Sequence, residues 1–365
     1  MYLKRIAATA ALLVGASDMS EADILMGVAG PLSGSVSYAG EILGLATEVA
    51  VDHLNEAGGV GGEEVVILME DDACNSEQGA VVGEKLIDDQ VSVVIGHSCS
   101  GATIAAMAGY QDAGIVMISP TATNPRVTDE GGSLIFRTAG RDDDQGAIGA
   151  ALIAEKWPDA NIALVDDSEP YGEGLASVVE ASLSSAGLKL ALRDKILAGE
   201  PDYVSLVDKL IAADVDVLYY GGRPREAALI IQEVHAQGEE LQILGPESMI
   251  SEDLWVIAGD AAEGILFTHY PDPKNDPELA HLVEIIEDAG IESSPAFFGA
   301  YAAIQAWGEA VRHAGTTNGP AVAQALRENE FDTVIGTIGF DDNGDVTGID
   351  SFVWYVWQDG AYRPH

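Results

Sequence analysis

Basic side chains are scarce in this sequence of 365 residues. Lysine and arginine together number 17, against 60 aspartates and glutamates, and the formal net charge is −43 at pH 7. Nucleic acids and anionic membrane surfaces attract positively charged proteins, so this charge excludes both as partners. Such an acidic surface repels itself at low salt and is screened at high salt, because the Debye length shrinks to about 3 Å near 1 M. The charge therefore suggests a salty habitat.

Long hydrophobic runs are also missing after the first residues. At the N-terminus, Lys4 and Arg5 precede the apolar run from Ile6 to Val14, and a small-residue site ends at Ala22. This pattern predicts a secretory signal peptide over residues 1–22, cleaved after Ala22 and too short to cross a membrane. We expect an exported protein with no stable membrane insertion and, since no cysteine lies near the site, no lipid anchor.

Cysteine is represented only by Cys74 and Cys99. In an oxidising compartment an isolated even pair is bonded rather than free, so we expect a disulfide between them. A bonded Cys99 excludes a cysteine nucleophile. The histidines are scattered without metal-ligand spacing, and the glycines of residues 58–62 leave a helix rather than opening one. We therefore predict neither a metal site nor a nucleotide cofactor.

Short apolar runs alternate with longer stretches of helical periodicity along the rest of the chain. This alternation predicts an α/β protein with mainly parallel sheets, and the length favours two doubly wound, Rossmann-like lobes. Polar segments at residues 135–147 and 269–278 and the strand-like run 351–357 are candidate crossings between the lobes. We expect one lobe over residues 23–141 plus 271–350, and the other over 142–270 plus 351–365.

The stretch from Val93 to Met107 runs from a strand into a helix through a turn that contains His97, Ser98 and Ser100. A nucleophile elbow requires glycine where Ser100 stands, so a serine hydrolase using Ser98 is a weak alternative. The first turn of a helix instead offers free backbone N–H groups to a carboxylate. A third interpretation is that Ser100 only caps its own helix.

The next strand is followed by a similar turn, in which Thr121 and Thr123 offer hydroxyl groups beside free backbone groups. In the second predicted lobe, Glu247 and Tyr171 each follow a strand. Ligands of parallel α/β sheets bind beyond the carboxyl ends of the strands. Donors for an anion in one lobe and a carboxylate in the other predict a site for a zwitterion.

Several motifs together resemble the periplasmic leucine/isoleucine/valine-binding proteins of ABC transporters. They are listed here in chain order: "AGPLSG", "LNEAGGVGG", "DDACNSEQ", "VIGHSCSG", "ISPTATNP", "FRTAGRDDDQG", "YGEGLA", "YYGG", "GPE" and "FDDNGDVTG". The resemblance implies a type I periplasmic binding protein, with a hinge of three crossings and the ligand held between the lobes. It also implies a periplasmic location, a branched-chain or other aliphatic L-amino acid as ligand, a membrane ABC permease as partner, and no enzymatic activity.

The resemblance also implies roles for single residues. Ser100 and Thr123 correspond to hydroxyl groups that hold the ligand carboxylate, and the backbone at Thr121 and the Glu247 side chain correspond to partners of its ammonium group. Tyr171 matches a tyrosine of the cleft, and the pair Cys74 and Cys99 matches the disulfide of the family. Ala122 and Cys99 lie within the same two turns and are included in the predicted site.

The chain departs from the family pattern around the ligand side chain. Arg223 stands where an aromatic residue often follows "YYGG", Tyr38 comes one residue early, and the aromatic near "PAFFGAY" is Phe297 or Phe298. We expect Arg223 either to extend out of the cleft or to pair with an acidic residue, because an aliphatic ligand offers it no partner. A sensor or receptor for another amino acid-like or carboxylate ligand is therefore the alternative to a branched-chain receptor.

Overall fold

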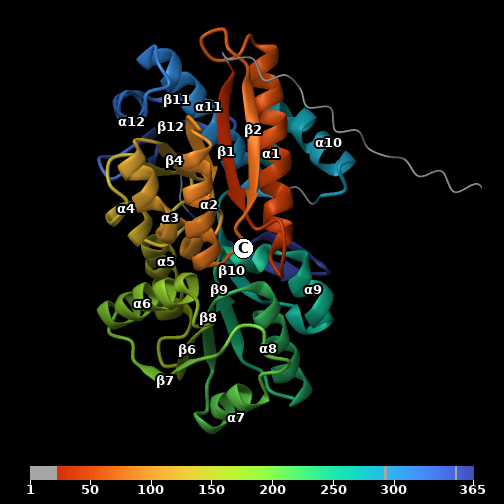
Figure 1. The fold of residues 1–365 in the computed structure, drawn as a ribbon. Helices are drawn as coiled ribbons and strands as arrows, with labels where there is room; N and C mark the ends of the chain where they lie inside the picture. The colour runs from red at the N-terminus through yellow and green to blue at the C-terminus, as the bar shows by residue number, and fades with distance from the viewer. Residues whose placement is uncertain (1–22, 292–293, 350–351) are drawn as a thin grey trace, which may run out of the picture.

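The structure is a computed structural model that describes residues 23–291, 294–349 and 352–365. The predicted signal peptide lies outside the described residues. Within them, the chain forms sheets of five, seven and three strands (Figure 1). The five-stranded sheet and most of the seven-stranded one are parallel, and helices lie between successive strands. The predicted α/β class is confirmed.

The five-stranded sheet has the order β2-β1-β3-β4-β5, and all its neighbouring strands pair in parallel. Its strands are β1 (Ile24–Gly30), β2 (Val65–Asp71), β3 (Val93–Gly96), β4 (Val116–Ser119) and β5 (Ile135–Arg137). The helices of this segment are α1 (Ser37–Glu56), α2 (Ser76–Asp88), α3 (Ser100–Ala113) and α4 (Arg126–Asp129). Because consecutive strands are joined by helices, every strand ends at the same edge of the sheet.

Helices from the C-terminal third complete this half of the molecule. They are α10 (Ala280–Asp288), α11 (Pro295–Ala314) and α12 (Gly319–Glu328), preceded by the short turns η3 (Pro273–Asn275) and η4 (Pro277–Leu279). The small sheet follows, with β11 (Phe331–Thr333), β12 (Gly336–Phe340) and β13 (Val346–Thr347). β12 and β13 pair as a hairpin whose turn is held by Asp341, which accepts three backbone N–H groups. The sequence "FDDNGDVTG" thus forms the hairpin turn that its Asn-Gly pair predicts.

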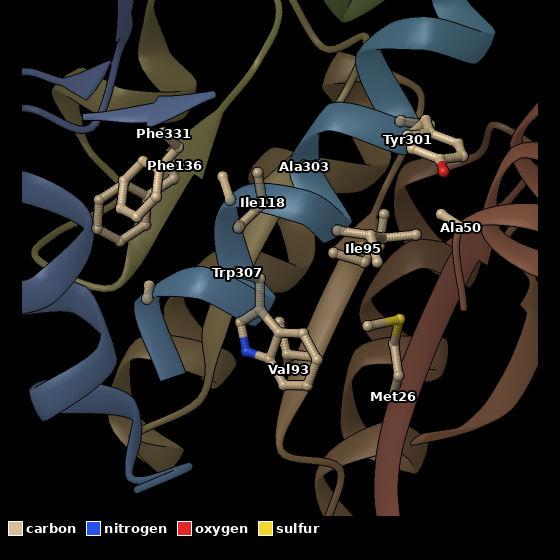
Figure 2. Close-up of a cluster of buried hydrophobic side chains, with 14 of the residues drawn as sticks. Met26, Ala50, Val93, Ile95, Ile118, Phe136, Tyr301, Ala303, Trp307 and Phe331 are labelled. Atoms are coloured by element: carbon tan, nitrogen blue, oxygen red, sulfur yellow. The ribbon is translucent and has the colours of Figure 1, made fainter. Parts of the chain in front are cut away.

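Successive side chains of a strand point to opposite faces, and both faces of the first sheet are buried. Val93 and Ile95 of β3 face a core that Trp307 of α11 fills (Figure 2). Val94 faces the other way, toward α2 and α3, with Tyr110 in that second core. A near-continuous apolar strand such as "VSVVIG" is what a parallel sheet covered on both faces requires.

The seven-stranded sheet has the order β15-β14-β10-β9-β8-β6-β7, with β14 and β15 antiparallel to their neighbours. Its strands are β6 (Ile162–Asp166), β7 (Leu190–Lys195), β8 (Val217–Gly221), β9 (Gln242–Gly245), β10 (Leu266–His269), β14 (Val353–Gln358) and β15 (Ala361–Pro364). Its helical segments are α5 (Asp142–Lys156), α6 (Pro170–Ser185), α7 (Val204–Ala212), α8 (Pro224–Ala236), η1 (Glu247–Ile250), α9 (Glu252–Ala258) and η2 (Gly259–Ala262). This sheet also buries both faces, against separate hydrophobic clusters.

The order of the elements shows where the chain passes from one half to the other. It leaves the first sheet after β5, leaves the second sheet after β10, and returns to the second sheet at β14. The two halves lie end to end in Figure 1, with α5 and β10 near their junction. These passages lie close to the predicted crossings, and the exact lobe boundaries stay a prediction.

Candidate functional site

A cavity of about 150 Å³ lies between the two halves. From the first half it is lined by the turns that follow β3 and β4 and by the facing sides of α1 and α11. From the second half it is lined by the turns that follow β6, β8, β9 and β10. The site therefore lies beyond the carboxyl ends of strands of both sheets, where the sequence predicts it.

The first wall contains the beginning of α3. The helix starts at Ser100 with Cys99 as its N-cap residue, and Cys99 provides no side-chain cap. The first N–H groups of a helix have no partner within it, and Ser100 and Gly101 bring this end to the cavity. Ser100 does not cap its own helix, because it is the first helical residue and its Oγ lies 3.3 Å from the backbone N of Asn124, from which it accepts a hydrogen bond.

The turn after β4 is fastened to the turn after β3. Thr121 Oγ1 donates to the carbonyl of Ser98 at 2.8 Å, and Ser119 Oγ donates to the carbonyl of His97 at 2.7 Å. Ser119 Oγ also accepts from the N–H of Ala122 at 3.1 Å. The Thr121 hydroxyl is thus used within the protein, and this residue can offer a ligand its backbone.

A buried polar chain supports the same turn from behind. Asp72 Oδ2 lies 2.7 Å from His97 Nδ1, and His97 Nε2 lies 3.0 Å from the hydroxyl of Tyr110. All three residues are fully buried. Asp72 Oδ1 also accepts from the N–H of Cys74 at 2.8 Å. Cys74 forms the predicted disulfide with Cys99, with a Cα–Cα distance of 5.4 Å. The start of α3 is therefore held by both a covalent and a hydrogen-bonded link to the turn after β2.

The second wall presents a carboxyl group. Glu247 is the first residue of η1, directly after β9, and it lines the cavity opposite Ser100. Gln145 Nε2 donates to Glu247 Oε2 at 2.6 Å. Burial raises the pKa of Glu247, and nearby Tyr171 and Gln145 lower it in part. Tyr171 lines the cavity too, and its buried hydroxyl makes no hydrogen bond of good geometry with the described residues.

Arg223 lies in the cavity wall at the start of α8. Its Nη2 is 3.6 Å from Glu169 Oε2 and 3.6 Å from Cys74 Sγ. The expectation that Arg223 pairs with an acidic residue of the protein is confirmed. Tyr38 also reaches the cavity, from α1.

Seven of the predicted site residues line the cavity; they are Tyr38, Cys99, Ser100, Thr121, Tyr171, Arg223 and Glu247. Three do not. Ala122 and Thr123 lie buried behind the wall in the turn after β4. Phe297 lies in the core, where its ring packs against Phe298 and Tyr301 at centroid distances of 5.5 and 6.2 Å. On α11 it is Ala296 and Ala300 that face the cavity.

The structure adds lining residues that the sequence did not single out. His269 and Tyr270, at the end of β10, complete the second wall. Burial lowers the pKa of His269 to about 4, so the imidazole is neutral at pH 7. The sequence did contain a signal, because the pair stands at the carboxyl end of a strand, close to where the other site residues stand. The polar residues that follow it instead predicted a crossing between the lobes.

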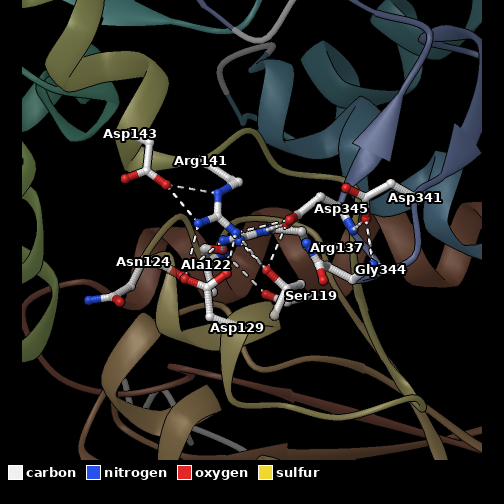
Figure 3. Close-up of polar contacts among 12 residues, drawn as sticks. Ser119, Ala122, Asn124, Asp129, Arg137, Arg141, Asp143, Asp341, Gly344 and Asp345 are labelled. Carbon is white, nitrogen blue, oxygen red and sulfur yellow. Dashed lines mark hydrogen bonds and ion pairs between the residues drawn. The ribbon is translucent and has the colours of Figure 1, made fainter.

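The buried Arg137 at the end of β5 holds the turn after β4 in place. Its Nε pairs with Asp345 at 2.5 Å, and its Nη1 donates to the carbonyls of Ala122 at 3.2 Å and Asn124 at 2.9 Å (Figure 3). The guanidinium is fully buried, and the Arg137 charge lowers the pKa of Asp345. A residue of the β12–β13 hairpin thus positions the turn that carries Thr121.

Arg141 extends this network across the passage between the halves. Its guanidinium contacts Asp345 at 2.9 Å, Asp129 at 2.9 Å and Asp143 at 2.7 Å (Figure 3). Asp143 belongs to α5 of the second half, whereas Asp345 and Asp129 belong to the first. The network therefore joins elements on both sides of the passage.

Comparison with known proteins covers nearly the whole chain. The profile of a family described as periplasmic binding protein matches residues 23–361. A protein of Brucella melitensis, named Leu/Ile/Val-binding protein homolog 1, is 40% identical over 341 residues, which are 93% of this chain and 92% of that protein. A leucine-, isoleucine-, valine-, threonine- and alanine-binding protein of Pseudomonas aeruginosa is 36% identical over 363 residues, which are 99% and 97% of the two chains.

Solved structures agree on the fold. The crystal structure of a leucine-binding protein from Thermotoga maritima superposes with a TM-score of 0.85 at 26% identity, and covers 94% of this chain and 97% of that one. An ABC transporter substrate-binding protein from Desulfitobacterium hafniense, in complex with Leu, has a TM-score of 0.77 at 25% identity, with 94% and 100% covered. The fold is that of a type I periplasmic binding protein. Among the described residues, no helix combines the length and apolar character needed to span a membrane.

Proposed function

The chain belongs to the periplasmic binding protein family, and from that premise we propose that it is an exported receptor for an aliphatic, branched-chain L-amino acid. It binds the amino acid between its two halves and delivers it to a membrane ABC permease. The halves act as lobes, 23–141 plus 271–350 and 142–270 plus 351–365, and close by movement at the passages between them. We place it in the periplasm, after removal of residues 1–22.

One observation carries this proposal: the free end of a helix and a carboxyl group face each other across one small cavity. Ser100 and Gly101 present backbone N–H groups from one half, and Glu247 presents its carboxyl group from the other. An amino acid zwitterion has one group for each wall, and charge-assisted hydrogen bonds offset the loss of its hydration. The α-carboxylate binds at Ser100 and the ammonium group binds at Glu247.

The remaining lining supports an apolar ligand side chain. Ile42 and Leu43 of α1, Ile250 of η1, and Ala296 and Ala300 of α11 contribute apolar surface to the cavity. Arg223 and Glu169 are the charged exceptions, and their pairing offsets both charges inside the protein. An aliphatic side chain is then compatible with the wall, and it gains by leaving water. The names of the related proteins support the same ligand class.

We infer that the receptor has no catalytic activity. The serine hydrolase alternative needs a base beside Ser98, and the nearest candidate is His97. Both ring nitrogens of His97 are occupied, by Asp72 and by Tyr110. Cys99 is in a disulfide and offers no thiolate. The family consists of binding proteins of transporters, which agrees with this inference.

The proposal is tested by calorimetric titration with leucine, isoleucine and valine, for the parent protein and for Glu247→Gln. The variant keeps the shape of the side chain and removes its charge, so we expect binding to weaken by about 2–5 kcal/mol, roughly thirtyfold or more. Glu239→Gln serves as the matched control, because Glu239 is exposed and lies outside the cavity. Equal affinities of parent and Glu247→Gln within a factor of about three would remove Glu247 from the site.

A second measurement identifies the ligand class directly. Mass spectrometry of the gently purified protein should detect leucine, isoleucine or valine as bound ligand. A dicarboxylate, or tight binding of glutamate with no binding of aliphatic amino acids, would favour the alternative receptor that uses Arg223. Turnover of an ester would contradict the absence of catalysis.

A further inference from the structure

A second carboxyl group lies behind Glu247 on the ammonium side of the cavity. Asp142, the first residue of α5, is fully buried and does not line the cavity. Gln145 Nε2 donates to Asp142 Oδ1 at 2.9 Å and to Glu247 Oε2 at 2.6 Å. One amide group therefore bridges two carboxyl groups, one from α5 and one from η1.

The orientation of that amide is fixed by its other end. Gln145 Oε1 accepts from Thr268 Oγ1 at 2.6 Å and from the backbone N–H of Glu247 at 3.3 Å. A backbone N–H can only donate, so the oxygen of Gln145 must face it and the NH2 group must face the acids. Gln145 supplies its two hydrogens to the carboxyl groups and carries no charge to neutralise them.

The positive charge of Arg137 acts on Asp142, but this guanidinium is already engaged. Its guanidinium pairs with Asp345 and donates to carbonyls of the turn after β4. The titratable groups that face the two acids from the surrounding elements are Arg137 of β5, Tyr38 of α1, Tyr171 of α6, Tyr219 of β8 and Tyr270 after β10. Burial raises the pKa of each of these tyrosines, so they are neutral at pH 7 and provide no positive charge.

Two neighbouring buried carboxyl groups without a cation of their own do not both ionise, because each charge opposes the other in a medium of low polarity. Burial and the nearby Glu247 raise the pKa of Asp142 well above its ordinary value, and burial raises that of Glu247. The N-terminus of α5 favours an ionised Asp142, but a helix end is a weaker influence than burial beside a like charge.

Oδ2 is the oxygen of Asp142 that is free to carry a proton. Asp142 Oδ2 is buried and makes no hydrogen bond of good geometry with the described residues, and the same is true of Thr123 Oγ1. Thr123 lies close enough to affect the ionisation of Asp142. A protonated Oδ2 can donate to Thr123 Oγ1 and an ionised Oδ2 can accept from it, so the Thr123 hydroxyl fits either state of Asp142.

We propose that Asp142 and Glu247 hold one proton between them in the ligand-free receptor, and that the ammonium group of the arriving amino acid displaces this proton into solvent. The inference rests on the proposed function, since it takes a cationic group at Glu247. The ammonium group replaces the proton as the positive charge beside the pair, so the charge on this side of the cavity is unchanged, and the α-carboxylate brings its negative charge to the start of α3. Asp142 acts as a positioning residue, through Gln145 and Glu247, and does not touch the ligand.

The test is a titration of the receptor with leucine at pH 7 in phosphate and in Tris, two buffers with different ionisation enthalpies. A released proton is taken up by the buffer, so the observed binding enthalpies should differ by an amount that corresponds to between about half and one proton. Affinity should also rise with pH through pH 7, by up to about tenfold per unit, and level off only above the pH at which the ligand-free receptor loses this proton. Equal enthalpies in the two buffers would overturn the proposal.

Single substitutions test whether the released proton comes from the pair Asp142 and Glu247. In Asp142→Asn the release should fall towards zero and the affinity should lose its pH dependence, whereas Asp144→Asn should behave like the parent. Asp144 is the matched control because it lies on the same helix and is exposed. Release that persists in Asp142→Asn would contradict the assignment. If that variant does not fold, Glu247→Gln, measured at higher leucine concentration, must lose the release instead.

The outcomes also separate this inference from the proposed function. Absence of any heat of binding with leucine, isoleucine or valine would refute the receptor itself. Binding without proton release would leave the receptor standing and refute only the shared proton.

Discussion

The two halves are in close contact where Gly174 of α6 meets Asn124 of the turn after β4. A methyl group at Gly174 would lie 2.1 Å from Asn124 Nδ2, far inside contact distance. Asn124 is buried; its Nδ2 donates to the carbonyl of Pro170 at 2.9 Å, and its Oδ1 accepts from the N–H of Arg126 at 3.0 Å. Gly174→Ala must therefore either turn this side chain out of its place or keep the halves apart.

The expected cost follows from those two hydrogen bonds. Each contributes about 0.5–1.5 kcal/mol, so their loss weakens the closed, ligand-bound form by about 1–3 kcal/mol, which corresponds to roughly 5- to 150-fold in affinity. Alanine is also the better helix former by about 1 kcal/mol, and this gain acts whether or not the halves have closed. Gly174→Ala should therefore weaken leucine binding while the unfolding temperature of the ligand-free protein stays equal or rises.

Calorimetric titration and thermal unfolding measure the two effects separately. Gly109→Ala is the matched control, because its methyl group would meet only Ile87 Cδ1, at 3.2 Å, within one half of the molecule. A second check combines Gly174→Ala with Asn124→Ala, which removes the obstructing amide, so the double variant should bind no worse than Asn124→Ala alone. A dissociation constant for Gly174→Ala within about twofold of the parent would refute the reasoning.

Four further predictions concern stability and specificity. Replacing Cys74 and Cys99 with serine should lower the unfolding free energy by about 3 kcal/mol in denaturant titrations, and an unchanged midpoint would contradict this. Raising NaCl from about 0.1 to above 1 M should raise the unfolding temperature, since screening weakens the repulsion of the acidic surface. Arg223→Ala should change leucine affinity by less than roughly fivefold in a calorimetric titration, because a partly exposed ion pair contributes little. Asp345→Asn should cost about 3 kcal/mol in urea unfolding at pH 7, and the difference should shrink below about pH 4 and be lost as the pH falls through the lowered pKa of Asp345, where Arg137 loses its ionised partner in the parent too.

The turns that form the site could be predicted from the sequence because each directly follows an apolar strand. Ser100, Thr121, Tyr171 and Glu247 all come after a short buried run that ends at the cavity. The carboxyl ends of parallel strands meet at one edge, so proximity follows from topology before any coordinates are known. The disulfide could also be predicted, because an oxidising compartment favours bonded cysteines and two cysteines allow only one pairing.

The helix α11 shows what the sequence could not settle. The prediction placed Phe297 or Phe298 at the ligand, and the structure directs both rings into the core and Ala296 and Ala300 toward the cavity. One residue of shift turns a helix by about 100°, so the lining depends on where the helix begins. The stretch "AFFGA" has apolar residues on every side of the helix, so its sequence does not show which side faces the core.

Asp142 was missed for a different reason. It is the first of three consecutive aspartates, and charged runs are ordinarily solvent-exposed. Here Asp143 and Asp144 are exposed and Asp142 is fully buried. Its burial depends on how α5 packs beneath η1 and β10, and a pattern in sequence does not record that contact.

The covering of the first sheet by α11 bears on how the chain folds. All five strands of that sheet lie before residue 138, yet the core on one of its faces needs Trp307 and Ile304 of α11 and Phe340 of β12. Asp345 likewise reaches Arg137 across 208 residues of sequence. Contacts of such separation make folding slow, because a long loop must close before they form. A chain shortened to end before residue 295 would leave one apolar face of this sheet only partly covered, by α1 and α10. The first half therefore cannot complete its core until the last third of the chain has been made.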